Sequence, residues 1–409
     1  MIVLLGIALT ISHVDRVLLS IAGPALMSER HLNATAMGLL LSSFAWTYTL
    51  CQLPSGWLVD RFGAKRVMTI AFAFWSIACT LTGFASGLTT LVVCRLMLGV
   101  AEAPFYAAAH STMAMAFTDR RKALATAIYT KGASLGPSLG VIVGSWLLLA
   151  AGWSHMFMIV GVVSLSFLLP WLMSVPRMSG NSMEDSGARW RVFRALLASR
   201  AVWGISLGYF GFLYLYYIYV TWLPIYLARE RGMSPADIAW LAWVPFVIAL
   251  AVGPATGLLV DWLIGKGYSQ TLVRKSAIGL GLLMGAAIIP AAFAHDASTA
   301  AFLFVTALAG QAIGAVNMLA LPSVIAPKGH AGLVGAFQQM WGSAGGIASP
   351  IVTGILYDKQ ADFRLAIVCA GVMLCLAAVG FLVILARIVP VPLPGARLCA
   401  APTPEYQQA

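Results

Sequence analysis

Residues 56–66 have the sequence GWLVDRFGAKR, a short basic turn between two long apolar segments. The segments on either side, 34–58 and 67–86, are long enough to cross a bilayer, which takes about 20 helical residues. The turn therefore joins two consecutive transmembrane helices. Apolar segments of similar length continue in both directions, separated by short polar or Gly- and Pro-containing links. We predict twelve transmembrane helices, at 1–27, 34–58, 67–86, 88–117, 123–150, 153–176, 201–228, 234–263, 274–294, 298–325, 331–357 and 363–388.

The composition supports the same class of protein. Of the 409 residues, 60% are apolar and only 10% are charged, whereas a soluble domain carries about 25% charged residues. The chain is therefore predicted to be an all-α integral membrane protein whose surroundings are a lipid bilayer. The formal net charge is +11. We expect no nucleic-acid partner, because basic residues in a membrane protein first serve its topology.

A long polar interruption, 177–200, divides the predicted helices into two sets of six. The first set contains GWLVDRFG, with Gly56–Asp60, and the second contains GLLVDWLIG, with Gly257–Asp261, each at the end of the second helix. This recurrence indicates duplicated six-helix units. We predict an N-terminal bundle, an interdomain loop, a C-terminal bundle and a cytoplasmic tail, at 1–176, 177–200, 201–388 and 389–409.

The basic residues predict how the chain is oriented. Seventeen of the 25 Lys and Arg residues fall in loops on the side of 177–200, and five fall on the opposite side. Cytoplasmic loops carry such an excess. We therefore predict that both termini are cytoplasmic, and the short loops favour a multi-pass protein of a bacterial inner membrane.

The remaining basic residues and two acidic residues are predicted to lie inside the membrane, all in the first six helices. A charge at this depth costs several kcal/mol, so such residues normally line a polar cavity and mark a substrate or proton path. The set contains three cations and two anions, which favours an anionic ligand. Its members are Asp15, Arg16, Arg95, Glu102 and Lys131.

The chemistry of these residues suggests roles. An arginine binds a carboxylate through two parallel hydrogen bonds, so Arg16 and Arg95 are predicted ligands of an organic anion. Asp15 and Glu102 are predicted proton carriers, because pairing an arginine with an anion favours protonation of a neighbouring buried carboxylate. His13 lies at the same depth, as a proton carrier or a structural residue. The alternative is that the charges only hold helices together, as the pairs Asp15 with Arg95 or Glu102 with Arg16.

GWLVDRFGAKR resembles the signature between the second and third helices of the major facilitator superfamily. The resemblance implies a fold of two pseudo-symmetric six-helix bundles and a cytoplasmic gate to which Asp60, Arg61 and Arg66 contribute. The same residues can at the same time form a tight basic turn that enforces topology. The positions that match the signature are Gly56, Leu58, Asp60, Arg61, Gly63, Lys65 and Arg66.

Within that superfamily the chain resembles the anion:cation symporters, which take up sugar acids, aromatic acids and related organic anions with protons. The resemblance implies alternating access with the proton as coupling ion and without a cofactor or metal, and we expect a monomer. The similar stretches lie in both halves, and they are HVDR at 13–16, WTYTLCQLPSGW at 46–57, CRLMLGVAEAP at 94–104, YFGFLYLYYIYVTWLPIYL at 209–227 and QQMWGSAGGIASPIVTG at 338–354.

The same resemblance implies roles for individual residues. His13 and Lys131 depart from the family pattern at plausible cavity positions, and we include both among the candidate substrate contacts. Lys131 either binds a second carboxylate or extends toward the aqueous vestibule. By similarity the proton-coupling residues are Asp15 and Glu102, the anion-binding residues are Arg16 and Arg95, and the polar substrate contacts are Tyr48 and Gln339.

Two other functions are compatible with parts of the sequence. GASLGPSLG at 132–140 resembles the glycine-proline motif in the fifth helix of proton-driven exporters of the same superfamily, although such residues also serve close helix packing. GASLG also matches the GxSxG pattern of a hydrolase around Ser134. That nucleophile needs a strand-turn-helix, which an apolar span does not provide. We therefore predict a transporter and not an enzyme.

Overall fold

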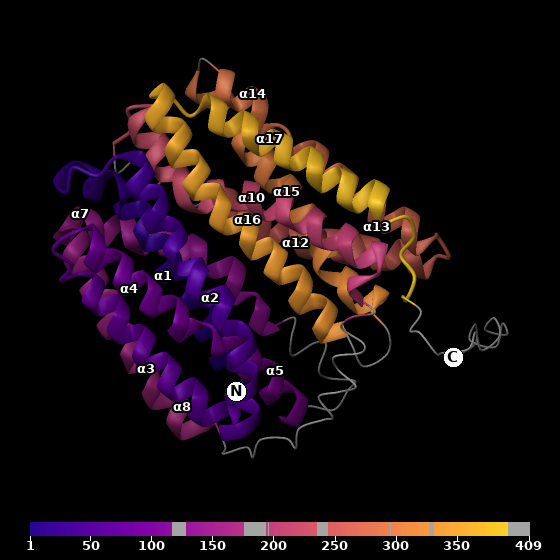
Figure 1. Cartoon of the computed structure of the whole chain (residues 1–409), viewed down its shortest axis with the longest axis horizontal. Helices are drawn as coiled ribbons and strands as arrows, with labels where there is room; N and C mark the ends of the chain where they lie inside the picture. The colour runs from indigo at the N-terminus through magenta and orange to yellow at the C-terminus, as the bar shows by residue number, and fades with distance from the viewer. Residues whose placement is uncertain are drawn as a thin grey trace.

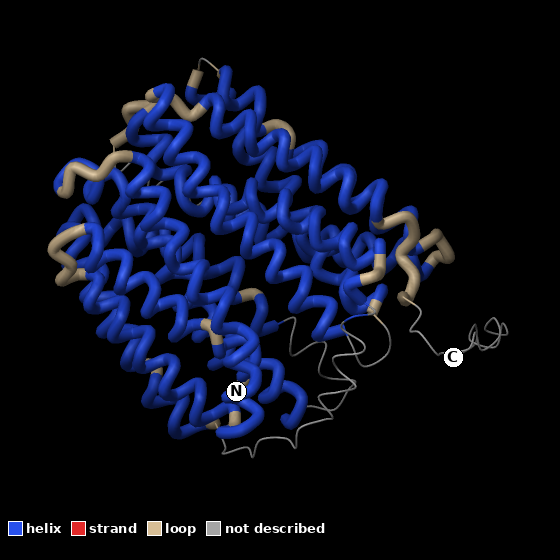
Figure 2. The backbone as a smooth tube through the Cα atoms, viewed as in Figure 1, coloured by secondary structure: helices blue, strands red, loops and turns tan. Residues whose placement is uncertain are grey.

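The computed structural model describes residues 1–116, 128–175, 194, 196–234, 244–294, 296–326 and 331–391. Every regular element within those ranges is a helix (Figure 2). Eight helical stretches among them are long and apolar enough to cross a membrane. The expected all-α membrane architecture is confirmed.

The helices of the first half are α1 (Ile2–Glu29), α2 (Ala34–Phe62), α3 (Ala64–Thr82), α4 (Leu88–Glu102), α5 (Pro104–Ala116), α7 (Gly132–Ser166) and α8 (Leu168–Ser174). Those of the second half are α10 (Arg200–Arg229), α12 (Val244–Gly265), α13 (Gln270–Gly285), α14 (Ile288–Phe293), α15 (Ala297–Ile325), α16 (Ala331–Gln360), α17 (Arg364–Ala378) and the π-helix η1 (Val379–Ile384). Figure 1 shows each half as a separate group of helices, indigo to purple and magenta to yellow.

Most predicted spans correspond to one observed helix, and four correspond to two consecutive helices, among them 153–176, which forms the end of α7 and α8. The span 88–117 forms α4 and α5, 274–294 forms α13 and α14, and 363–388 forms α17 and η1. The break between α4 and α5 places Glu102 at the end of a helix. Pro104 lacks the backbone N–H that would continue α4, so α4 ends at Glu102 and α5 begins at the proline.

The fifth and sixth predicted spans meet at a bend inside α7. Gly152 has a φ of +79°, in the left-handed region that favours glycine, and the helix continues on both sides of it. Residues 117–127, which precede α7, lie outside the described ranges, as do residues 177–193 of the predicted interdomain loop and 392–409 of the predicted tail. The exact domain boundaries therefore stay a prediction.

A pair of lysines shows the internal duplication at atomic detail. Lys65 Nζ donates a hydrogen bond of 2.7 Å to the carbonyl oxygen of Leu172, and Lys275 Nζ donates one of 2.9 Å to that of Leu382. In both cases the partners are 107 residues apart. Each lysine thus satisfies a carbonyl near the C-terminal end of the last helix of its half, where cations are favoured. Two halves of the same fold explain this repeated contact.

The halves meet along α1 with α10, α2 with α16 and α7 with α12. Their hydrogen bonds lie at one end of the molecule, which we call the Asp358 end. Asp358 Oδ1 and Oδ2 accept from the backbone N–H groups of Ala34 at 2.9 Å and Thr35 at 2.7 Å, so α16 caps the N-terminus of α2. Ser20 Oγ donates to the carbonyl oxygen of Thr221 at 2.6 Å.

Close backbone approach strengthens contact at the Asp358 end. A Cβ at Gly38 would overlap the Pro350 carbonyl oxygen, and a Cβ at Gly354 would overlap that of Ala34. The opposite end, which carries Arg61 and which we call the Arg61 end, differs. Among the described residues, no hydrogen bond joins the halves there. The molecule is therefore closed at the Asp358 end.

Candidate functional site

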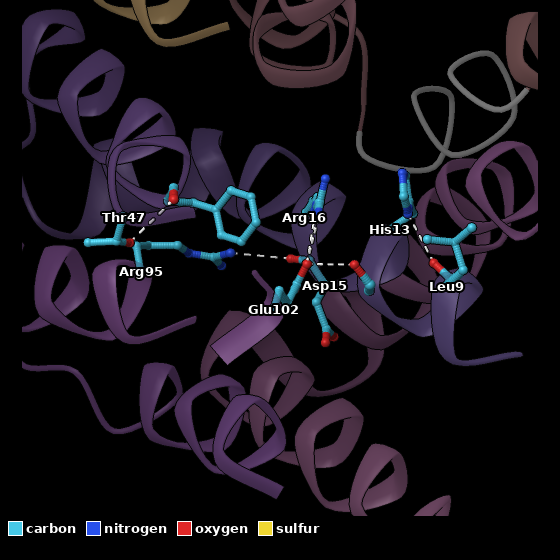
Figure 3. Close-up of polar contacts among 9 residues, drawn as sticks. Leu9, His13, Asp15, Arg16, Thr47, Arg95 and Glu102 are labelled. Carbon is cyan, nitrogen blue, oxygen red and sulfur yellow. Dashed lines mark hydrogen bonds and ion pairs between the residues drawn. The ribbon is translucent and has the colours of Figure 1, made fainter. Parts of the chain in front are cut away.

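The main candidate site is an ion pair between α1 and the end of α4. Arg16 donates to Glu102 Oε2 from Nε at 3.0 Å and from Nη2 at 2.8 Å (Figure 3). The Glu102 side chain is fully buried, whereas 17% of the Arg16 side chain is exposed. A buried carboxylate therefore holds a cation that is still open to an incoming group.

Aromatic side chains surround the guanidinium. Its carbon lies 4.6 Å from the ring centre of Phe44 and 4.7 Å from that of Tyr48, both on α2. Such cation–π contacts hold the guanidinium while leaving its N–H groups to bind other partners. Tyr106 of α5 and Tyr217 of α10 also interact electrostatically with Arg16. Tyr217 belongs to the second half, so the site lies where the two halves face each other.

Asp15 belongs to a second polar cluster, because adjacent residues on a helix diverge by about 100°. Asp15 is 1% exposed and accepts from Cys79 Sγ of α3 at 3.5 Å. Arg95 Nη1 donates to the backbone oxygen of Asp15 at 3.3 Å, and its guanidinium carbon lies 5.2 Å from the ring centre of Phe157. Figure 3 shows Arg95 approaching Asp15 rather than Arg16.

The structure thus divides the predicted set of charges rather than gathering it. Arg95 is 2% exposed and packs inside the first half, away from the face shared with α10. In this conformation Arg16 pairs with Glu102 and Arg95 donates to the backbone of Asp15, so the two arginines belong to separate clusters. Electrostatic interaction still connects the clusters, because Asp15 and Glu102 influence each other through the protein interior. The role of Arg95 in anion binding stays a prediction.

Three other predicted contacts lie outside the Arg16 cluster. His13 Nδ1 donates to the carbonyl oxygen of Leu9 in its own helix at 3.0 Å, because that oxygen can only accept. Lys131 is exposed and immediately precedes α7. Gln339 is half-buried on α16, two turns before Gly346, against which the Tyr217 ring packs. The role of these three residues as substrate contacts therefore stays a prediction.

The predicted gating residues lie at the Arg61 end. The Arg61 guanidinium carbon lies 5.1 Å from the ring centre of Trp57 and 5.4 Å from that of Phe62, so it packs on the end of its own helix. Arg66 is exposed, and the side chain of Asp60 lies outside the described part. The gating role stays a prediction. A structure in which the Arg61 end is closed would test it.

Four residues of the cluster were not predicted as contacts, namely Ser12, Phe44, Tyr106 and Tyr217, and two of them are instructive. Ser12 Oγ donates to Glu102 Oε2 at 2.5 Å, and Tyr217 faces Arg16. Both had a signal in the sequence. Ser12 precedes Arg16 by four residues, which places the two on one helix face. Tyr217 follows Arg16 by 201 residues. The same offset separates Ser20 from Thr221, and it separates the two copies of the recurring motif at Gly56 and Gly257.

A metal centre or a hydrolase nucleophile finds no support in the described residues. No group of three or more His, Cys, Asp or Glu side chains among them is placed to hold a metal ion. Ser134 lies within the first turn of α7 and not in the strand-turn-helix that the hydrolase pattern requires.

Comparison with known proteins identifies the family. A model described as Major Facilitator Superfamily matches residues 5–350. The chain belongs to the Major Facilitator Superfamily. Members of this superfamily are built from two halves related by an internal repeat, as the paired lysine contacts here show. The resemblance noted in the turn at 56–66 is thereby confirmed.

Several similar members of the superfamily are named as transporters or probable transporters of sugar acids. The chain is 31% identical to GarP, the probable galactarate/D-glucarate transporter of Escherichia coli (strain K12), over 93% of each chain. It is 29% identical to the D-galactonate transporter of Escherichia coli O6:H1, over 87% of this chain and 88% of that one. A bacterial homologue of the human lysosomal transporter Spinster, solved inward-facing and unoccupied, shares the fold. It has a TM-score of 0.79, 18% identity and coverage of 93% and 95%. The chain is therefore a multi-pass membrane transporter and not an enzyme.

Proposed function

We propose that this transporter imports a sugar acid together with protons by alternating access. The observation that carries the proposal is the partly exposed Arg16, held by the buried Glu102 on the face that α1 shares with α10. One residue there is able to bind a carboxylate, and its present partner is able to bind a proton.

The surroundings of Arg16 suit a hydroxylated anion. The guanidinium binds a planar carboxylate through two hydrogen bonds. Tyr48 and Tyr106 from the first half and Tyr217 from the second surround it, and phenol groups both donate and accept hydrogen bonds. A polyhydroxy acid would use these groups along its length. The named substrates of GarP and of the D-galactonate transporter have this chemistry.

The ion pair also provides a mechanism of coupling. A substrate carboxylate that takes Arg16 removes the cation that neutralises Glu102. A lone negative charge at this depth is costly, so the Glu102 carboxylate then takes a proton. Anion and proton therefore bind together. Asp15 immediately precedes Arg16 in α1. It is buried together with Arg95, and we propose it as the second proton carrier.

Alternating access then requires the closed end to open. In this conformation Asp358 and the Ser20 contact hold α2 to α16 and α1 to α10 at the Asp358 end. The positive-inside pattern assigns that end to the outer side. The structure would thus represent the inward-facing member of the cycle, from which both ligands leave to the cytoplasm.

The export alternative loses its main sequence support. Gly132, Gly136 and Gly140 of the glycine-proline motif lie on one side of α7 and pack directly against α1. A Cβ at Gly136 would overlap His13 Cβ, and one at Gly132 would overlap the backbone oxygen of Gly6. Close packing of α7 on α1 therefore explains these glycines without an export function.

Uptake into proteoliposomes tests the proposal. The purified protein is exposed to labelled D-galactonate, galactarate, adipate and benzoate, with the outside more acidic than the lumen and without sodium. We expect accumulation of a sugar acid that a protonophore abolishes. Adipate, a six-carbon dicarboxylate without hydroxyls, should accumulate less than galactarate. Failure of every anion to accumulate would contradict symport. If the labelled anion instead left the proteoliposomes as protons entered them, the protein would be an exporter.

A further inference from the structure

The hydrogen bonds of Glu102 are distributed unequally between its two oxygens. Oε2 accepts from Arg16 Nε at 3.0 Å, from Arg16 Nη2 at 2.8 Å and from Ser12 Oγ at 2.5 Å. Oε1 is buried and has no hydrogen-bond partner among the described residues. A buried carboxylate oxygen without a partner is able to accept a further hydrogen bond or a proton.

Ser12 differs from three buried hydroxyl groups of the neighbouring helices α2 and α3. Ser43, Ser55 and Thr82 each donate to a carbonyl oxygen three or four residues back in their own helix. Ser12, which is 1% exposed, instead donates across 90 residues to the Glu102 carboxylate. Its position one turn before Arg16 brings both donors to the same oxygen.

We propose that Ser12 is a positioning residue that holds Glu102 Oε2 while Arg16 binds the substrate, so that the proton binds at Oε1. This inference rests on the proposed proton-coupled function. When Arg16 turns to a substrate carboxylate, Oε2 loses two of its three hydrogen bonds and keeps the one from Ser12. An O–H bond then forms at Oε1 with a proton from the open aqueous side. The proton leaves when the substrate departs and Arg16 returns.

Several charged or titratable groups act on Glu102 and bear on its pH dependence. Asp15 and Arg16 face it from α1, Cys79 from α3, Arg95 from α4 and Tyr217 from α10. Replacement of Ser12 changes none of these groups. A change in the pH response of a Ser12 variant therefore reports the hydroxyl group itself.

The test compares Ser12→Ala and Ser12→Thr with Ser43→Ala as the matched control. Ser43 is equally buried, and its hydroxyl bonds only within its own helix. D-galactonate uptake into proteoliposomes is measured against external pH, with exchange at equal pH alongside. For Ser12→Ala we expect the midpoint of the uptake profile to move about one unit toward higher pH, because the charged carboxylate loses a donor. Exchange at equal pH should persist, because Arg16 and Glu102 are both still present.

Ser12→Thr should restore the wild-type profile, and Ser43→Ala should match the wild type. A Ser12→Ala profile that superimposes on the wild type would overturn the positioning role, as would equal shifts in Ser12→Ala and Ser43→Ala. A second measurement needs no transport. Infrared spectra of the purified protein, titrated with pH, contain a protonated carboxyl band that Glu102→Gln removes, and Ser12→Ala should shift its midpoint. If wild-type uptake ignores pH while this band still shifts, the coupled function fails and the positioning of Glu102 stands.

Discussion

The two halves of this transporter share a fold but not its buried charges. In the first half the buried side chains include Asp15, Arg95 and Glu102, whereas no charged side chain is buried in the described part of the second half. The buried polar side chains among the described residues of the second half are Ser206, Thr221, Gln311, Asn317, Gln338, Ser343, Ser349 and Thr353. Under the proposed function, the first half would carry the proton and the second half would contribute neutral contacts.

The clearest contrast lies between α1 and α10, which occupy corresponding places in the two halves. Ser20 and Thr221 are 201 residues apart and contact each other, so they lie near the axis that relates the halves. The same offset pairs Arg16 with Tyr217, and these residues also interact. A cation thus faces a phenol across the axis. Such asymmetry suits a substrate with a charged end and a hydroxylated end.

The largest expected effect comes from removing the cation of this pair. Arg16→Ala should weaken D-galactonate binding by about hundredfold or more, since losing one partner of a buried, hydrogen-bonded charge pair costs about 2–5 kcal/mol. Isothermal titration calorimetry on the purified protein measures the change in Kd. Arg387→Ala removes an exposed arginine of the second half and should leave Kd unchanged. Equal losses in both variants would remove Arg16 from the site.

Glu102→Gln should separate coupling from binding. The amide keeps the shape and the hydrogen bonds to Ser12 and Arg16 but cannot take up a proton. We expect gradient-driven accumulation of D-galactonate to fall at least about tenfold, the ratio that one pH unit sustains, while exchange at equal pH continues. Both are measured in the same proteoliposomes. Accumulation equal to that of the wild type would exclude Glu102 as a coupling residue.

Tyr217→Phe tests the neutral member of the pair. Loss of one neutral hydrogen bond costs about 1 kcal/mol, so the KM for D-galactonate should rise about fivefold. Adipate transport should change little, because that acid has no hydroxyl group for the phenol to bind. Initial rates of uptake give both values. A larger loss than that of Arg16→Ala would reverse the assignment of charged and neutral roles to the two halves.

An effect as small as that of Tyr217→Phe is expected at the contact between the halves. Asp358→Asn removes the charge that caps the N-terminus of α2 and leaves one acceptor oxygen for Ala34 and Thr35. Loss of such a cap costs about 1 kcal/mol, so the population open at the Asp358 end should rise about fivefold. Spin labels on the ends of α2 and α16 measure the distribution of distances. A distribution identical to that of the wild type would show that Asp358 does not hold this end closed.

Much of the architecture was predictable from the sequence. A long apolar segment crosses a membrane as a helix, because a helix gives each backbone N–H and C=O group a hydrogen-bond partner within the segment. The spacing of apolar segments therefore predicted the helices, and the recurring motif at Gly56 and Gly257 predicted the duplication. The cost of a buried charge similarly singled out Asp15, Arg16, Arg95 and Glu102.

The grouping of those charges was decided only by the tertiary structure. Arg95 and Glu102 lie on the same helix, α4, but Arg95 packs on Phe157 and donates to the backbone oxygen of Asp15, whereas Glu102 pairs with Arg16. Ser12 became part of the site because α1 brings it to an oxygen of α4. The sequence determines which residues a membrane cannot tolerate alone. Helix packing determines which of these residues contact each other, because the contacts of a side chain depend on which helix packs against its own.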